Sequence, residues 1–428
     1  MAASQMSIYF FLQMAIILGV CRLVGLAARK IGQPQVVGEM IAGVMLGPSL
    51  FGWLAPDAQQ WLFPKETLKM LYVGAQLGVG LYMFLVGVDF QTDHFKTRLK
   101  SAASVSLAGM IVPFLFAVVL APWLVKLGGL FSPKATVPEA TLFLGAAIAI
   151  TAFPMLARII YERGLTGTSL GTLALAAGAI DDAAAWCVLA VVVASFEKLP
   201  DGTINNAIAI KAILGGLGYA VFVILFGRKL LAPLGRMAER AGKITPTILG
   251  IVMMLFSLAC WGMDAIGIHA VFGGFLLGTA MPRGFFATEL KKQLEPFAVV
   301  FLLPMFFTFS GLNTQLDVVT NPSLLGVTLV VLAASIGGKG VACWAAARLT
   351  GEDNRTSLAI GTLMNSRGLM ELIIINIGLQ KGIIEPTLFS MLVVMAIVTT
   401  LMASPLFELV YGRHARKEGK LGEAQTGG

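Results

Sequence analysis

Runs of about 20 apolar residues, separated by short polar connections, follow one another along almost the whole chain. A helix of this length crosses the hydrocarbon core of a bilayer, where every backbone polar group must be hydrogen-bonded within a helix or a closed barrel. The pattern predicts an all-α polytopic membrane protein with thirteen transmembrane helices, at about 8–28, 35–54, 68–89, 100–125, 139–161, 168–196, 206–231, 245–263, 267–282, 297–313, 323–348, 356–380 and 386–411.

Two short patterns recur seven predicted helices apart. The sequence VGEMIAG at 37–43 is echoed by VFGGFLLG at 271–278, and MFLVG at 83–87 by MFFTFSG at 305–311. An odd offset makes the two copies cross the membrane in opposite directions. The pattern therefore predicts two inverted-topology repeats, helices 1–6 and 8–13, with 206–231 as a linker helix, an arrangement typical of secondary transporters. The alternative is a chance likeness between Gly-rich membrane helices.

Composition and charge support this interpretation. The chain is 57% hydrophobic and 13% charged, with a mean hydropathy of +0.84, which excludes an ordinary soluble domain. If the N-terminus lies outside, most of the 31 Lys and Arg residues fall on the cytoplasmic side, as does the C-terminus. The net charge of +8 is then a signal of topology, and no nucleic-acid partner is needed to explain it. The four cysteines all fall within predicted helices, in a spacing that suggests neither disulfides nor a zinc site.

Asp181 and Asp182 stand in the middle of an apolar segment and are the strongest signal of function. Carboxylates are costly at that depth and are usually retained for ions or protons. Because two neighbouring carboxylates repel each other, at least one is expected to exchange protons near neutral pH. Lys339, in another apolar segment, needs a buried anionic partner. Adjacent residues differ by about 100° around a helix, so the two aspartates are expected to have different roles. The pattern does not determine which aspartate has which role; as a working choice we give the cation and proton to Asp182 and Lys339 to Asp181. A fixed structural salt bridge is the alternative.

Two predicted helices carry interruptions at the same depth. Pro154, close to Thr151, removes a backbone hydrogen bond from the helix at 139–161. The helix at 356–380 contains a polar run ending in glycine, which comprises Asn365, Ser366, Arg367 and Gly368. Interrupted helices in matching positions of two repeats indicate a transport site. Freed carbonyls and Thr151 could help the aspartates hold a monovalent cation, and Arg367 or Glu371 could offset the charges of the half-helix ends. A harmless kink at Pro154 is the alternative.

Glu39 lies one turn inside the second predicted helix, on the expected cytoplasmic side. It is a candidate for lining an entry funnel, and a snorkelling or interhelical role explains it equally well.

The chain resembles the monovalent cation:proton antiporter 2 superfamily, in particular plant cation/H+ exchangers and yeast K+/H+ antiporters. The matching stretches are GQPQVVGEMIAGVMLGPSLFG, MFLVGVDF, TAFPMLARIIYERGL, AGAIDDAAAWCVLA, FGGFLLGTAMPRG, LLPMFFTFSGLNTQ, GGKGVACWAAARLTG and LMNSRGLMELIIINIGL. The resemblance implies a Na+/H+ antiporter-like fold with crossed broken helices. It also implies that Asp181 and Asp182 form the ion-binding motif, and that Lys339 corresponds to the family's basic residue in the eleventh helix.

The resemblance also implies that the membrane domain at 1–411 contains two sets of helices with different functions. Core ion-transport helices are expected at 100–196 and 323–411, and dimerisation or scaffold helices at 1–90 and 245–315. The implied assembly is a homodimer in contact with lipids. A short basic cytoplasmic tail is expected at 412–428, and no soluble regulatory domain of the kind found in many members of that superfamily is expected in this chain.

The expected function is secondary active antiport of K+ or Na+ against protons by alternating access, with cation and protons competing for the aspartates. No cofactor is expected beyond the transported ions. A channel-like conductor and a Na+-coupled symporter of related fold are the alternatives. An intramembrane aspartyl protease is disfavoured because both aspartates share one helix, so the chain is not expected to be an enzyme. A compact chain of this kind suggests the inner membrane of a prokaryote.

Overall fold

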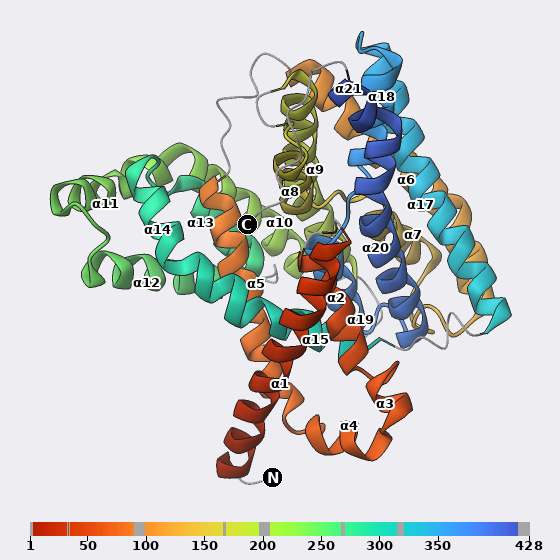
Figure 1. Ribbon diagram of the computed structural model, residues 1–428, viewed down its shortest axis with the longest axis horizontal. Coiled ribbons are helices and arrows are strands. Elements are labelled where there is room, and N and C mark those ends of the chain that lie inside the picture. Colours follow the sequence, from red (N-terminus) through yellow and green to blue (C-terminus); the bar gives the residue numbers. More distant parts are fainter. Residues whose placement is uncertain are drawn as a thin grey trace. The chain divides into compact units, whose positions relative to one another are not determined.

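The structure is a computed structural model that describes residues 3–31, 33, 35–89, 99–165, 168–196, 206–266, 270–314 and 321–417, and nearly all of them are helical (Figure 1). By their internal contacts they form two compact units. Unit 1 comprises Met1–Cys21, Leu54–Gln91 and Val193–Phe309, and unit 2 comprises Arg22–Trp53, Thr92–Val192 and Ser310–Gly428.

Eight predicted helices appear as a continuous helix within about five residues of the expected positions. These are α1 (Ala3–Lys30), α5 (Leu68–Asp89), α6 (Leu99–Leu127), α9 (Ser169–Phe196), α12 (Pro246–Ala265), α13 (Ala270–Ala280), α17 (Pro322–Leu349) and α20 (Pro386–Phe407). The predicted helix at 35–54 is instead divided into α2 (Gln35–Leu46) and the short α3 (Phe51–Leu54), and a second short helix, α4 (Pro56–Leu62), follows. Among the described residues, nine stretches are long and apolar enough to cross a membrane, and shorter apolar helices accompany them. The prediction of an all-helical membrane protein is confirmed.

Three predicted segments are longer than the hydropathy pattern indicates. The first runs through α10 (Asn206–Phe222), η2 (Val223–Gly227) and α11 (Arg228–Ala241), and the second through α14 (Phe285–Pro296), η3 (Phe297–Leu302) and α15 (Leu303–Leu312). The third continues from α20 through η4 (Glu408–Gly412) into α21 (Arg413–Lys417). Hydropathy identifies only the apolar part of a helix, so charged extensions beyond it were missed. Within the expected tail at 412–428, residues 412–417 are helical and residues 418–428 lie outside the described part, so the tail stays a prediction.

In unit 1, α5 packs against α13, and α13 against α12. The contact between α5 and α13 is a backbone approach at small residues, as is common between membrane helices. A Cβ on Gly87 would lie 2.1 Å from the carbonyl oxygen of Phe275, and a Cβ on Gly278 would lie 2.1 Å from that of Phe84. These glycines are therefore required by packing.

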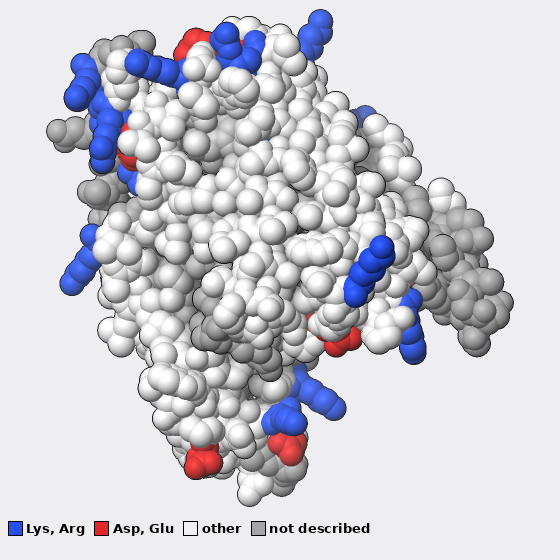
Figure 2. All heavy atoms as spheres, turned by 90° about the vertical axis from the view of Figure 1, so that its right-hand side faces the viewer, with Lys and Arg blue, Asp and Glu red and all other residues white. Residues whose placement is uncertain are grey.

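In unit 2, α6 packs against α7 (Val137–Ala149) and α17. The predicted helix at 139–161 is divided into α7 and α8 (Phe153–Glu162), and the one at 356–380 into α18 (Asn354–Leu363) and α19 (Leu369–Gln380). Both predicted interruptions are therefore present. On the face shown in Figure 2, uncharged side chains cover most of the surface, and most Lys and Arg side chains gather at the end where α18 and α21 lie. Such a surface suits a chain that crosses a lipid layer.

Candidate ion-binding site

Local sequence explains each helix break. After α7, Ile150 is extended, with φ −79° and ψ 138°, and Pro154 occupies the first turn of α8, where a missing N–H costs no helical hydrogen bond. Gly368 precedes α19 with φ 156° and ψ −129°. Side-chain-bearing residues rarely adopt that conformation, which explains a glycine at this position.

The two breaks are joined by hydrogen bonds. The Thr151 hydroxyl donates to the carbonyl oxygen of Met364 at 2.7 Å, and the backbone N–H of Ala152 donates to the carbonyl oxygen of Ser366 at 3.0 Å. Both bonds connect segments more than 200 residues apart in sequence. The two interrupted segments thus meet in unit 2, and this meeting point of 150–152 and 364–368 is called the crossing below.

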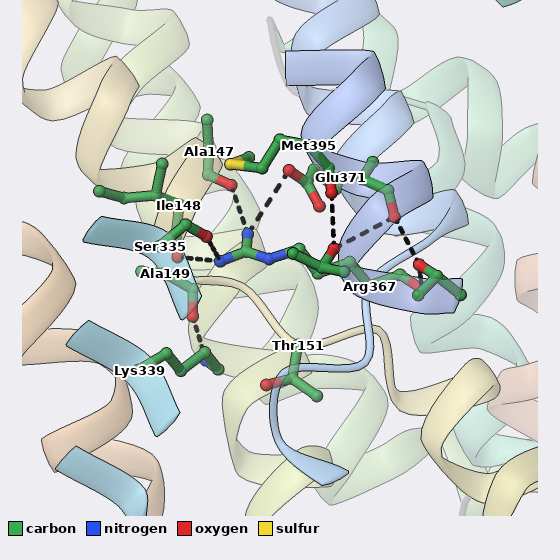
Figure 3. Close-up of polar contacts among 12 residues, drawn as sticks. Ala147, Ile148, Ala149, Thr151, Ser335, Lys339, Arg367, Glu371 and Met395 are labelled. Carbon is green, nitrogen blue, oxygen red and sulfur yellow. Dashed lines mark hydrogen bonds and ion pairs between the residues drawn. The ribbon is translucent and has the colours of Figure 1, made fainter. Parts of the chain in front are cut away.

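Two buried cations cap the end of α7 that faces this crossing. The Arg367 guanidinium donates to the carbonyl oxygens of Ala147, at 2.9 Å, and Ile148, and the Lys339 ammonium donates to that of Ala149 (Figure 3). The last carbonyls of a helix lack intrahelical partners and carry a partial negative charge. The two side chains therefore supply both the missing donors and the compensating charge. Arg367 also donates to the hydroxyl of Ser335 on α17.

Lys339 is paired with Asp181. Its Nζ lies 2.6 Å from Asp181 Oδ2, and both side chains are completely buried. The other carboxylate oxygen of Asp181 accepts a hydrogen bond of 2.8 Å from Ser106 on α6. A buried ion pair is tolerated when further hydrogen bonds satisfy its remaining polar atoms, and Asp181 meets that condition.

A proline in α6 accounts for a third acceptor of Lys339. Nζ lies 3.3 Å from the carbonyl oxygen of Gly109. In a regular helix that carbonyl would accept from the N–H four residues later, but residue 113 is Pro113, which has none. The glycine at 109 also allows α6 to approach α17 closely, since a Cβ there would lie 2.6 Å from Cys343 Sγ. Sequence reasoning missed Ser106, Gly109 and Pro113; a serine and a mid-helix proline in an apolar run were the available signals.

Asp182 differs sharply from its neighbour. Its side chain is completely buried, and neither carboxylate oxygen has a hydrogen-bond partner among the described residues. An ionised carboxylate in that condition is strongly disfavoured, so Asp182 requires a proton or a cation. The described residues contain no group of three or more His, Cys, Asp and Glu side chains that could hold a metal ion.

Most residues expected at the site belong to this crossing. Asn365 donates to the carbonyl oxygen of Gly361 at 3.0 Å, and Glu371 lies 3.5 Å from Arg367. Glu39 is instead on α2, buried, and accepts a 2.9 Å hydrogen bond from Gln35. The transport roles assigned to all these residues stay predictions.

Comparison with known proteins identifies the family. The transmembrane domain described as sodium/hydrogen exchanger matches residues 15–410. The Na(+)/H(+) antiporter NhaS4 of Synechocystis is 40% identical over 92% of this chain and 95% of its own length. Cation/H(+) antiporter 19 of Arabidopsis thaliana and K(+)/H(+) antiporter 1 of Saccharomyces cerevisiae are each 31% identical, over 95% and 96% of this chain. The chain spans about half the length of these two relatives, 50% and 47%.

The fold is shared with a solved antiporter. The structure of the sodium proton antiporter MjNhaP1 from Methanocaldococcus jannaschii matches 97% of this chain and 97% of its own, with a TM-score of 0.66 and 14% sequence identity. Together with the sequence relatives, this confirms the resemblance to monovalent cation:proton antiporters of the second type. The chain is an integral membrane protein of the sodium/hydrogen exchanger family, a family of transporters and not of enzymes.

Proposed function

We propose that this antiporter exchanges K+ or Na+ for protons by competition at Asp182. One monovalent cation or one proton neutralises the carboxylate, and the transport core moves between the two sides of the membrane only in the neutralised state. An unneutralised carboxylate would be too costly to carry through an apolar barrier. The printed names of the relatives, Na(+)/H(+), K(+)/H(+) and cation/H(+) antiporters, support this class of substrate.

The observation that carries the proposal is the contrast between two adjacent carboxylates. Asp181 is fully engaged by Lys339 and Ser106, whereas Asp182 is buried with both oxygens unpaired among the described residues. If Asp182 had only a structural role, the free-energy cost of burying its two unpaired oxygens would not be compensated by any hydrogen bond. A role in which an ion or proton comes and goes explains why the site is left open.

The Asp181–Lys339 pair is the proposed coupling device. Lys339 holds Asp181, Gly109 and Ala149 at once, and so connects α9, α6 and the end of α7. A change of charge at Asp182 acts on this pair through the adjacent Asp181. We expect the crossing, with Thr151 and the carbonyls near it, to complete the cation's oxygen shell.

The finer architecture belongs to the same proposal. We infer thirteen membrane crossings in two inverted repeats, with the N-terminus outside and the C-terminus in the cytoplasm. Helices in 100–196 and 323–411 would carry the ion against a scaffold formed by 1–90 and 245–315, in a homodimer within a prokaryotic inner membrane. Support comes from the internal repeat, the charge bias and the two matching broken helices.

The test is proton flux in proteoliposomes that contain a pH-sensitive dye, with K+ and Na+ added separately. Wild-type protein should move protons when a cation is added, with a bell-shaped dependence on pH, and Asp182→Asn should not. Asp57→Asn, an exposed aspartate on α4, is the matched control and should behave as wild type. A cation current without proton movement would contradict the proposal and support a channel. Cation-dependent uptake of an organic solute would support a symporter.

A further inference from the structure

Glu371 is a second buried carboxylate at the crossing, separate from the aspartate pair. It lies in the first turn of α19, its side chain is 1% exposed, and neither carboxylate oxygen has a hydrogen-bond partner among the described residues. Its ion-pair contact is with Arg367, one turn earlier, at 3.5 Å. Burial without donors opposes the charged form of this carboxylate, and the nearby guanidinium stabilises it, so Glu371 is placed between two opposing influences.

Arg367 is already committed elsewhere. NH1 donates to Ala147 at 2.9 Å, and NH2 donates to Ile148 and Ser335 (Figure 3). The nitrogen that faces Glu371 is therefore the one that holds the end of α7. NH1 carries a second hydrogen and Nε has no hydrogen-bond partner among the described residues, so Arg367 can still donate towards Glu371. An ionised Glu371 would attract the guanidinium and draw it away from Ala147 and Ile148, whereas a protonated Glu371 would exert no such attraction.

The charged groups around Glu371 can be named element by element. Arg367 lies just before the first residue of α19, and Lys339 on α17 holds the last carbonyl of α7, that of Ala149. α20, which packs against α19, contains no ionisable side chain along its length. α7 also packs against α19, but its charged residue, Glu139, is engaged in a capping box with Thr136 at the opposite end.

We propose that Glu371 is a second proton-binding site of the transport core, whose proton state is passed by Arg367 to the end of α7. The connection is contiguous: Glu371 faces Arg367 NH1, Arg367 holds Ala147 and Ile148, and the next carbonyl, Ala149, is held by Lys339, the partner of Asp181. Protons at Glu371 and the cation at Asp182 are then linked through one short helix end. This inference rests on the proposed competition at Asp182.

The first test measures how steeply cation affinity depends on pH. A cation that competes with one proton loses affinity by about tenfold per pH unit, and a linked second proton makes the loss steeper. On the acid side, the half-saturating cation concentration of wild type should therefore change by more than tenfold per pH unit, and that of Glu371→Gln by tenfold or less. Glu295→Gln, an exposed glutamate on α14, is the matched control and should keep the wild-type slope. Equal slopes in wild type and Glu371→Gln would overturn the proposal.

The second test observes the proton directly and does not need transport. Infrared difference spectra recorded across a pH titration should contain the band of a protonated carboxylic acid that disappears in Glu371→Gln and persists in Asp182→Asn. If Glu371→Gln retains every such band of the wild type, Glu371 is not a proton site. If wild type shows no cation–proton exchange while this band is present, the proposed function fails and the proton site stands.

Discussion

Adjacent aspartates have separate environments because a helix turns its neighbouring residues by about 100°. Asp181 is directed at Lys339 and Ser106, while Asp182 meets no donor among the described residues. Removing one partner of a buried ion pair leaves the other partner as an uncompensated buried charge. Removing an unpaired buried carboxylate instead takes away an unfavourable group. The two carboxylates should therefore have opposite effects on stability.

Asp181→Asn should lower the free energy of unfolding by about 3–5 kcal/mol, because it strands the Lys339 ammonium in the interior. Asp182→Asn should leave stability unchanged or raise it. The measurement is the midpoint of thermal unfolding of each purified variant in one detergent. Asp57→Asn serves as the control for an exposed aspartate. A loss of stability in Asp182→Asn as large as in Asp181→Asn would show that both carboxylates are structurally paired.

At the scale of single elements, α6 supplies a backbone acceptor to Lys339 because Pro113 lacks the N–H that would otherwise occupy it. The carbonyl of Gly109, freed in this way, accepts from Lys339. Pro122, in the same helix, likewise frees the carbonyl of Val118, a residue that is 56% exposed. The two prolines thus have the same backbone chemistry but only one of them has a functional neighbour.

Pro113→Ala should weaken cation binding by about tenfold. The new N–H competes for the Gly109 carbonyl, and a hydrogen bond to a charged group is worth about 1.5–3 kcal/mol. Lys339, having lost an acceptor, should interact more strongly with the aspartates, and its positive charge should then oppose binding of the cation. The measurement is the half-saturating K+ or Na+ concentration for proton flux, with Pro122→Ala as the control. Equal effects of the two substitutions would assign the loss to helix straightening alone.

The start of α18 is a capping site outside the apolar spans. Asp353 accepts hydrogen bonds from the backbone N–H groups of Arg355, at 2.9 Å, and Thr356, at 3.1 Å. Hydrogen bonding from Thr356 holds the pKa of the Asp353 carboxyl below its usual value. Since the folded-state pKa is depressed, the stabilisation is complete above the unfolded-state value, about 3.9, and is lost as pH falls through the folded-state pKa.

Asp353→Ala should therefore cost about 1 kcal/mol of stability at neutral pH, the usual value of an N-cap. The difference from wild type should shrink as pH falls through the depressed folded-state pKa of Asp353, because the wild-type cap then becomes protonated as well. Thermal unfolding across an acid titration is the measurement, with Glu352→Ala as a control at the neighbouring position. A difference that persists unchanged in acid would contradict the capping explanation.

At the scale of the whole molecule, the distribution of Lys and Arg predicts which loops face the cytoplasm. In a variant with Cys21, Cys187, Cys260 and Cys343 replaced by alanine, a cysteine at Lys65 should react with a membrane-impermeant thiol reagent added outside intact cells. A cysteine at Lys243 should react only after the cells are opened. The reverse pattern would invert the proposed orientation.

Sequence patterns anticipated much of this architecture, for identifiable reasons. Apolar runs of bilayer length predict helices because lipid offers the backbone no other hydrogen-bond partner. Pro154 and Gly368 predict the two breaks because each opposes a regular helix locally. Helix ends were less accurate where charged extensions continue past the apolar stretch, as in α11 and α14.

The sequence by itself thus determined a helical membrane protein, two interrupted helices and a set of buried charges, because these depend on local composition and length. Only the tertiary structure decided that Asp181, and not Asp182, meets Lys339, and that Arg367 caps α7 beside Glu371. Those pairings join segments that are 158 and 220 residues apart. They depend on how helices rotate and pack against one another, and one residue of rotation, about 100°, is enough to exchange the two aspartates.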